Sequence, residues 1–204
     1  MKKASKRRVP AQDRSRERVA RILDAAAHEF AERGVEAATI ESIAERAETS
    51  VGSIYQFFPN KLAIYEAIGN MYLEEVRALF AVLVSDDAIE VPWRTVISAT
   101  IDAFSELHRS SITFRAIWSN ITYSRRFFSA GQAMNAELAE RAEMVFGRMA
   151  KHVPAAKRKL LATVTIETMS ALLLLSADKP RGQAKPLLDE AKMLIQRYLE
   201  PYLD

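Results

Sequence analysis

The sequence predicts an all-α protein, with a three-helix helix-turn-helix domain at the N-terminus and a larger helical domain after it. Apolar residues recur at helical spacing along the 204-residue chain. No segment shows the alternation of apolar and polar residues that is typical of a strand. Ser, Thr, Asn and Pro precede many of the apolar stretches, as they do at helix starts, and Gly or Pro often follows them. With 49% hydrophobic residues the chain can bury a substantial core.

The sequence pattern predicts four helices in the N-terminal part, separated by short turns. Gly34 is typical of a helix C-cap, Thr39 and Ser50 of N-caps, and Pro59 of a terminator. The apolar pattern places these helices at residues 13–33, 40–47, 50–58 and 60–83.

Five more helices are predicted after the loop at residues 85–92, which is the best candidate for a boundary. Pro154 fits the start of one of them, and the segment from Asp178 to Pro186 is expected to be a loop. The five helices are placed at residues 93–108, 111–120, 124–151, 154–177 and 186–200. We therefore divide the chain into residues 1–60 (arm and helix-turn-helix), 61–84 (connecting helix) and 85–204 (the larger domain).

Charge is concentrated at the N-terminal end. Nine Lys and Arg residues lie between Met1 and Arg21, against only Asp13 and Glu17, although the formal net charge of the chain is +3. A basic end on a net acidic body predicts a polyanionic partner there. The alternative is a disordered, solvated leader.

Composition restricts the location of the protein and its possible cofactors. The chain has no cysteine, which excludes disulfides and thiolate zinc sites. The charged N-terminus is not followed by an apolar stretch of the kind found in a signal peptide. The longest apolar run, Ala171 to Leu175, is far below the roughly 20 residues of a membrane span. We expect a cytoplasmic protein without a membrane or metal partner.

The helix expected at 154–177 leaves no clean polar face. A helix that is apolar all round must be covered on every side. We expect one side to meet the body and another to meet a second subunit, which gives a four-helix dimer interface together with the last helix. The alternative is a central helix in a monomer. The predicted interface residues are Leu161, Val164, Thr168, Leu172, Leu175, Leu194 and Tyr198.

The second and third helices have the spacing of a helix-turn-helix. Ala44 is small enough for two helices to cross, Glu48 stands at the turn, and Ile54 is an apolar anchor. We expect Ile54 and Phe57 to face inward with Ile43. Ser50, Val51, Ser53 and Gln56 then face outward. A short polar helix of this kind fits the major groove of DNA, which is about 12 Å wide.

The outward residues have individual predicted roles. Gly52 allows the backbone to approach the duplex, and Tyr55 is placed to reach a phosphate. Gln56 can hydrogen-bond a base edge or a phosphate. Lys61 and Thr39 stand at helix starts, where backbone N–H groups favour phosphate.

Residues 39–68, TIESIAERAETSVGSIYQFFPNKLAIYEAI, resemble the N-terminal domain of the TetR family of transcriptional regulators. The matching positions are Thr39, Ile43, Ala44, Ala47, Ser50, Gly52, Tyr55, Phe58 and Lys61. Glu48 departs from the pattern, because the family usually has Gly there; a left-handed backbone at Glu48 costs roughly 1 kcal/mol. The predicted DNA-binding residues are Thr39, Thr49, Ser50, Val51, Gly52, Ser53, Tyr55, Gln56 and Lys61.

The resemblance implies a homodimeric repressor on a roughly palindromic operator. It also implies a ligand-binding and dimerisation domain at the C-terminus, whose small-molecule effector shifts the fourth helix and releases DNA. Aromatic and Met residues are candidates for the pocket, although core packing is the commoner role for each; Glu167 is a candidate for a cationic ligand or for pairing across a dimer. The candidates are Trp93, Phe104, Phe114, Trp118, Phe127, Met134, Met144, Phe146, Glu167 and Met169.

Catalysis is not predicted. His28, His108 and His152 are scattered over different helices, and no phosphate-binding glycine loop or nucleophile elbow is present. The remaining alternative is a regulator, repressor or activator, that responds to a protein partner or to no effector. A closed apolar cavity within residues 90–175 would favour the small-molecule version, and a filled core would favour the alternative.

Overall fold

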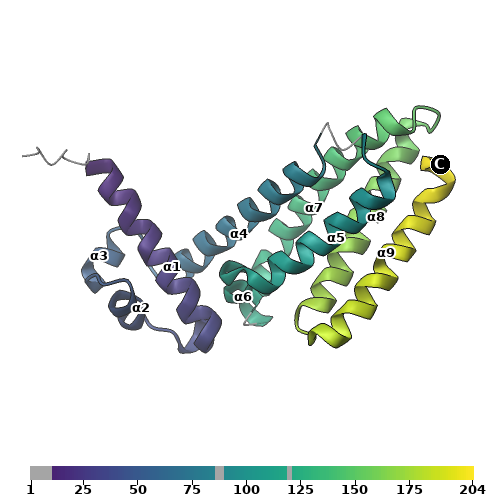
Figure 1. Ribbon diagram of the computed structural model, residues 1–204. Coiled ribbons are helices and arrows are strands. Elements are labelled where there is room, and N and C mark those ends of the chain that lie inside the picture. The colour runs from purple at the N-terminus through teal and green to yellow at the C-terminus, as the bar shows by residue number, and fades with distance from the viewer. Residues whose placement is uncertain (1–10, 86–89, 119–120) are drawn as a thin grey trace, which may run out of the picture.

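The computed structural model describes residues 11–85, 90–118 and 121–204, and of these it describes only the backbone for residues 11, 12 and 121–128. The described residues form helices joined by short turns, without strands (Figure 1). The all-α prediction is therefore confirmed. The helices are α1 (Ala11–Ala37), α2 (Ile40–Arg46), α3 (Val51–Tyr55), α4 (Lys61–Leu83), α5 (Trp93–Ser110), α6 (Ile112–Trp118), α7 (Ile121–Met149), α8 (Ala155–Ala177) and α9 (Arg181–Leu203).

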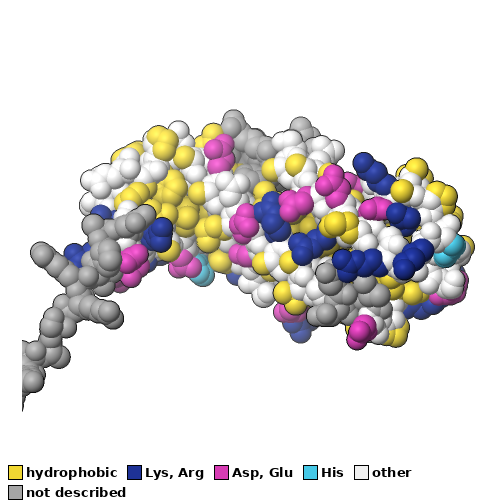
Figure 2. Space-filling view, turned by 90° about the horizontal axis from the view of Figure 1, so that it is seen from above, with side chains coloured by type: hydrophobic (Ala, Val, Ile, Leu, Met, Phe, Trp, Pro, Cys, Tyr) yellow, Lys and Arg dark blue, Asp and Glu magenta, His cyan; other side chains and the backbone are white. Residues whose placement is uncertain are grey.

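The molecule has two parts, which we call the head and the bundle. The head consists of α1, α2, α3 and the first half of α4, and the bundle of the second half of α4 with α5, α7, α8 and α9 (Figure 1). On the face seen in Figure 2, Lys and Arg side chains over the bundle have Asp and Glu side chains among them, whereas the head shows a mainly apolar patch. The bundle also contains ion pairs, such as those of Arg77 with Glu74 and Glu137.

Helix α6 joins the two parts. It packs against α1 and α4, and its Ala116 and Ile117 are buried in the core of the head. Tyr65 of α4 lies in the same core and donates a hydrogen bond from Oη to the Ile117 carbonyl oxygen at 2.8 Å. The head is therefore held by the start of α4 and by α6 together.

Helix α8 is the central helix of the bundle. Its buried residues pack in one core with residues of α5, α7 and α9. By length and composition α8 is the one helix among the described residues that could cross a membrane, with a mean hydropathy of 1.8. Packing against α5, α7 and α9 accounts for one side of α8, but only 39% of its apolar stretch is buried, so part of its apolar surface stays exposed.

Several helix ends differ from the expected bounds, and two of the differences involve a glycine or a proline. The break expected after the first helix lies at Gly34, where φ is 78°, although helical structure continues to Ala37. The last helix begins at Arg181, so the expected loop up to Pro186 was wrong. Pro186 lies inside α9, in its second turn, where the missing N–H leaves the Gly182 carbonyl without its usual intrahelical bond.

Candidate nucleic-acid interface and ligand cavity

Both helices of the helix-turn-helix begin at capped N-termini. Ser42 N–H donates to Thr39 Oγ1 at 3.0 Å, and the Ser42 hydroxyl accepts from Thr39 N–H in return. Ser53 N–H donates to Ser50 Oγ at 3.1 Å at the start of α3. These caps satisfy backbone donors that a helix start leaves without partners.

The turn between α2 and α3 contains a left-handed residue, at the position where the sequence departs from the family pattern. Glu48 has a φ of 50°, and among the described residues it is the one non-glycine with positive φ. Thr49 N–H donates to the Ala44 carbonyl at 3.0 Å, which closes the turn. The strain at Glu48 is therefore present in the fold.

The third helix is anchored from below by apolar residues. Ile43 and Ile54 are fully buried, as predicted. Phe57 was also predicted to face inward, but it is only half-buried. Phe58 is the aromatic residue inside the core. Helix α3 ends at Tyr55, and in the turn that follows the N–H groups of Phe57 and Phe58 both donate to the Ile54 carbonyl.

The outward side of α3 borders a concave surface that also includes two arginines of α1. Tyr55 and Gln56 are exposed, and a Cβ placed on Gly52 would meet no atom within 4 Å. Arg18 and Arg21 lie across this surface, at i and i+3 on α1. Sequence reasoning placed them only in the basic end, although their helical spacing could have shown that they share a face. The surface is lined by Arg18, Arg21, Glu48, Thr49, Ser50, Gly52, Ser53 and Gln56.

Two of the residues that were predicted to face outward are only partly exposed. Val51 is half-buried against the core of the head. Ser53 is also half-buried, and its Oγ is enclosed without a hydrogen-bond partner. The first turn of α3 packs closely enough on its support to enclose the short side chain. The exposed polar surface of α3 is thus carried mainly by Ser50 and Gln56.

Lys61 has a structural partner. Its Nζ donates to the carbonyl oxygens of Glu36 at 3.0 Å and Ala38 at 2.7 Å, which ties the start of α4 to the segment before α2. The N-cap of α4 is Asn60, whose Oδ1 accepts from Ala63 N–H at 2.9 Å. A phosphate contact by Lys61 stays a prediction, and it would have to use the one remaining N–H of the ammonium group.

A group of charges fixes α2 against α1. Arg46 of α2 contacts Glu29 at 3.0 Å and donates two hydrogen bonds to Glu32, at 2.9 and 2.6 Å. These bonds hold the pKa of the Glu32 carboxyl below its usual value and raise the pKa of Arg46. Glu29 is almost fully buried, and its charge is paired with Arg46 at 3.0 Å and with Arg33 at 3.5 Å. The pair of helices that carries α3 is positioned by this group.

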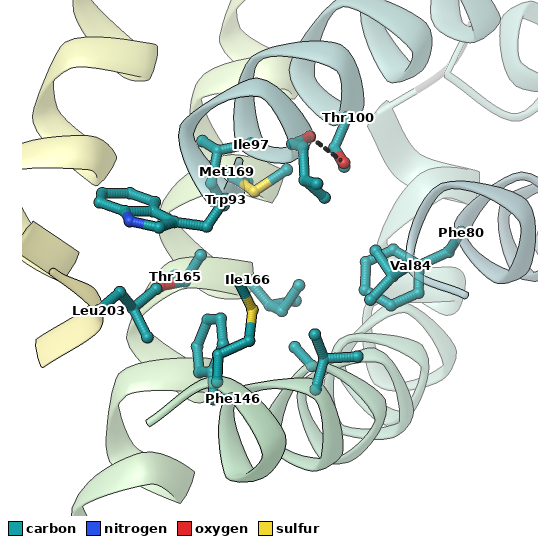
Figure 3. Close-up of a pocket in the computed structure, with 14 residues that line it drawn as sticks. Phe80, Val84, Trp93, Ile97, Thr100, Phe146, Thr165, Ile166, Met169 and Leu203 are labelled. Atoms are coloured by element: carbon teal, nitrogen blue, oxygen red, sulfur yellow. Dashed lines mark hydrogen bonds between the residues drawn. The ribbon is translucent and has the colours of Figure 1, made fainter. Parts of the chain in front are cut away.

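The bundle encloses an apolar cavity with a volume of about 50 Å³ (Figure 3). Trp93, Phe146 and Met169 line it, as the sequence predicts for pocket residues. The wall is completed by residues of α4, α5, α7, α8 and α9: Phe80, Val84, Val96, Ile97, Thr100, Ala142, Val145, Met149, Thr165, Ile166 and Leu203. Most of them were not predicted, because aliphatic residues of a helical core look alike in sequence.

The structure does not bring the other pocket candidates into this cavity. Phe104 and Met134 are buried elsewhere in the bundle core, and Met144 is exposed. Glu167 lies on the surface, where its Oε2 accepts from Asn135 Nδ2 at 3.0 Å. The side chain of Phe127 lies outside the described residues.

The candidates Phe114 and Trp118 belong to an aromatic group between head and bundle. The two rings stack at 5.1 Å, and His108 stacks on Phe114 at 4.2 Å. Tyr72 Oη and His108 Nε2 are 3.0 Å apart. Burial lowers the pKa of His108 to about 4 and raises that of Tyr72.

A carboxylate of α4 holds the start of α6 beside this aromatic group. Glu75 accepts from the hydroxyls of Ser111 at 2.8 Å and Thr113 at 2.9 Å. Ser111 Oγ also accepts from Phe114 N–H at 3.1 Å. Together with the Tyr65 bond at the other end of α6, these contacts couple α6 to α4.

The predicted dimer residues fall into two classes. Val164, Leu175 and Leu194 are exposed apolar residues of α8 and α9, and an uncovered apolar face is consistent with a partner. Leu161 is fully buried within the protomer, so its assignment to the interface was wrong. It lies on the side of α8 that faces the core. The remaining three residues are half-buried: Thr168, Leu172 and Tyr198.

No group of three metal-ligating side chains occurs in the part of the chain that the structure describes. The chemistry that the structure offers there is hydrogen bonding, charge and apolar contact.

Two family models match the chain. One, described as bacterial regulatory proteins of the tetR family, matches residues 22–68. The other, described as the tetracyclin repressor-like C-terminal domain, matches residues 92–199. The first covers the head with its helix-turn-helix, and the second covers most of the bundle.

Individual proteins give the same picture. The HTH-type transcriptional regulator SrpR of Pseudomonas putida is 34% identical over 83 residues, which are 41% of this chain and 38% of SrpR. A TetR-family transcriptional regulator from Streptomyces coelicolor superposes with a TM-score of 0.63 at 27% identity, over 93% of this chain and 99% of that one. The SmeT–triclosan complex superposes with a TM-score of 0.65 at 24% identity, over 92% of each chain.

Proposed function

The chain belongs to the TetR family of transcriptional regulators, and we propose that it is a repressor that binds a palindromic DNA operator as a homodimer and is released by a small apolar or amphipathic effector. The assignment of residues 1–60 to DNA binding, 61–84 to the connection and 85–204 to effector binding and dimerisation is part of this proposal. So are a cytoplasmic location and the lack of a catalytic activity.

The concave surface around α3 is the observation that carries the DNA-binding role. It combines exposed hydrogen-bonding groups of α3, such as Gln56, with the guanidinium groups of Arg18 and Arg21. Gly52 leaves the middle of the helix without a side chain, so the backbone can come close to a duplex. Arginines would contact phosphates and position the helix, while Gln56 would read a base edge or add a further phosphate contact.

The dimer follows from the apolar residues that the protomer leaves exposed on α8 and α9. A second copy packed on Val164, Leu175 and Leu194 would remove them from water, with Thr168, Leu172 and Tyr198 at their side. Two heads related by a twofold axis would then meet two major grooves about 34 Å apart, which explains a palindromic operator.

The cavity of the bundle supports a small-molecule effector over a regulator without one. It lies within the core, and Phe80 and Val84 of α4 form part of its wall. A ligand that pushes on these residues moves the helix that leads to the head. SmeT, which shares the fold, is known as a complex with triclosan. Regulation by a protein partner, and an activating role, stay alternatives.

The direct test is selection of genomic fragments by the purified protein, followed by anisotropy titrations of the selected DNA at several salt concentrations. Gln56→Ala is expected to weaken binding of the selected site roughly 10-fold, in the range of one lost base contact. Arg21→Ala is expected to weaken binding to every sequence and to lower the salt slope by about 1.

Gln183→Ala is the matched control for Gln56, because Gln183 is an exposed glutamine of α9 that lies outside the concave surface around α3. It should leave DNA affinity unchanged. If no fragment is enriched, or if Gln56→Ala and Gln183→Ala bind alike, the proposed interface is wrong.

The dimer has its own test. Leu175→Glu places a charge in the exposed apolar face and should give monomers in sedimentation that bind the operator poorly. A dimer that survives this change, or a wild-type monomer with full operator affinity, would contradict the assembly.

A further inference from the structure

The cavity of the bundle is lined by uncharged side chains alone among the residues that the structure describes there. Moving an ion into such surroundings without a partner costs far more than binding returns. The ligand of this cavity must therefore be neutral and mostly apolar. Its polar needs can be met only by Thr100, Thr165 and Trp93, which are the polar side chains in the lining.

Two of these three groups already have partners. Thr100 Oγ1 donates to the Val96 carbonyl at 2.8 Å, drawn as a dashed line in Figure 3. Trp93 Nε1 donates to Asp204 Oδ1 at 3.0 Å, and Arg94 also binds the Asp204 carboxylate. The polarity of the cavity is thereby reduced further.

Thr165 is different. Its side chain is 2% exposed, and its Oγ1 has no hydrogen-bond partner and almost no surface open to the cavity, so a ligand reaches it only after a shift of the wall. In Figure 3 it lies between Leu203 and Ile166 at the wall of the cavity. A buried hydroxyl without a partner is uncommon in proteins and destabilises the fold, because water is lost and not replaced. A ligand that supplies the missing partner would recover this loss.

We propose that the cavity binds a neutral ring-sized molecule with a single hydroxyl or carbonyl group, which hydrogen-bonds Thr165 Oγ1. The proposal rests on the proposed function only in naming this molecule as the effector; the binding itself does not require DNA.

The size of the cavity links binding to movement. A volume of about 50 Å³ has room for only a few water molecules, each of which needs at least about 10–15 Å³. A six-membered ring needs more, so it must displace part of the wall. Phe80 and Val84 stand on the side opposite Thr165 and Leu203 in Figure 3. A ring anchored at Thr165 therefore presses on α4, the helix that enters the head.

Calorimetric titration of the full chain with four related probes tests the ligand class. Phenol carries the hydroxyl, toluene replaces it with a methyl group, and benzylammonium and benzoate carry charges of either sign. Phenol is expected to bind roughly 10-fold more tightly than toluene, the upper range for one neutral hydrogen bond. Both charged probes should bind more weakly than phenol.

Variants of the two threonines test the contact. Thr165→Val keeps the shape of the side chain and should abolish the preference for phenol, whereas Thr165→Ser should retain it. Thr100→Val is the matched control, since its hydroxyl lines the same cavity but already has a partner, and it should also retain the preference.

Three results would overturn the proposal: equal affinity for phenol and toluene, a phenol preference that survives Thr165→Val, or the absence of binding by every probe. Tight binding of a charged probe that is lost on Thr165→Val would overturn the ligand class. A phenol complex that leaves DNA affinity unchanged counts instead against the effector role in the proposed function, and the cavity assignment stands.

Discussion

The core of the head is packed more tightly than the core of the bundle. Most of the largest side chains with less than 2% exposure belong to the head, among them Ile22, Phe30, Ile43, Ile54 and Tyr65. The bundle has a cavity in its core and an uncovered apolar face on α8 and α9, whereas buried hydroxyls without a partner occur in both parts, at Ser53 in the head and at Thr165 in the bundle. The head is thus tightly packed, whereas the bundle has a space and an exposed apolar surface that the proposed effector and the proposed second subunit would fill.

The difference has a physical reason. The head must hold α3 at a fixed angle, and any void below it would let the helix tilt. A ligand site needs the opposite property, since an effector larger than the cavity binds only if the wall can move. Packing defects are therefore placed where the proposed regulation needs them, at a cost in stability.

Two matched isoleucine truncations test this comparison and should show its largest effect. Ile54→Ala in the head is expected to lower the free energy of unfolding by about 4 kcal/mol, because it opens a void in a tightly packed core. Ile166 lines the existing cavity and therefore has fewer neighbours to lose. We expect Ile166→Ala to lower the free energy of unfolding by about 2 kcal/mol. Urea denaturation of the two variants beside wild type measures both values.

The milder change Ile54→Val, expected to cost about 1 kcal/mol, checks that the loss follows the size of the void. Equal costs at Ile54 and Ile166 would break the comparison, since they would mean that the bundle is packed as tightly as the head.

The junction between the two parts should respond to pH. His108 is buried with a pKa lowered to about 4, against 6.5 for an exposed histidine. Between these values the unfolded chain binds the proton and the folded one does not, so stability is full above pH 6.5 and falls as the pH decreases toward 4. The shift corresponds to about 3 kcal/mol over this interval.

His108→Gln removes this group, and its free energy of unfolding should change less between pH 6.5 and 4 than that of wild type. Unfolding curves at half-unit pH steps give the two profiles. Parallel profiles would mean that His108 is protonated inside the fold and that the junction is wetter than the structure indicates.

Sequence alone predicts the head better than the bundle. The caps at Thr39 and Ser50, the buried Ile43 and Ile54 and the strained Glu48 all follow from local rules of spacing, capping and backbone geometry. What it missed in the head depends on tertiary packing. Examples are the enclosed Ser53 hydroxyl and the use of Lys61 to bind two carbonyls.

In the bundle the sequence predicts the helices, but it does not predict which face of each helix packs against which neighbour. Leu161 and Leu175 have the same chemistry and lie on the same helix, yet one is in the protomer core and the other on the surface. Phe104 and Phe146 are both buried, but only Phe146 reaches the cavity. Which apolar residue meets which neighbour is set by the crossing of helices far apart in the chain, and spacing along one helix does not encode it.

The unpaired hydroxyl in the bundle offers a test of smaller size. Thr165→Val should raise the free energy of unfolding by about 1 kcal/mol without ligand, because it replaces a buried hydroxyl that lacks a partner. Thr100→Val should not raise it, since that hydroxyl is bonded to Val96. Thermal unfolding of both variants separates the two threonines, and a destabilised Thr165→Val protein would show that the hydroxyl has a partner after all.

The smallest effect is expected at the turn between α2 and α3, where the defect is backbone strain and not a void. Glu48→Gly should raise the free energy of unfolding by about 0.5–1 kcal/mol, because glycine adopts a φ of 50° without the steric cost of a Cβ. Glu48→Ala is the control: it removes the carboxylate but keeps the Cβ, so it should bring no such gain. If alanine and glycine stabilise the protein equally, the cost at this position is electrostatic and the backbone is relaxed. If only Glu48→Gly stabilises the protein, the head contains a local defect, as the bundle does. This defect is backbone strain and not a void, so it leaves the support of α3 rigid.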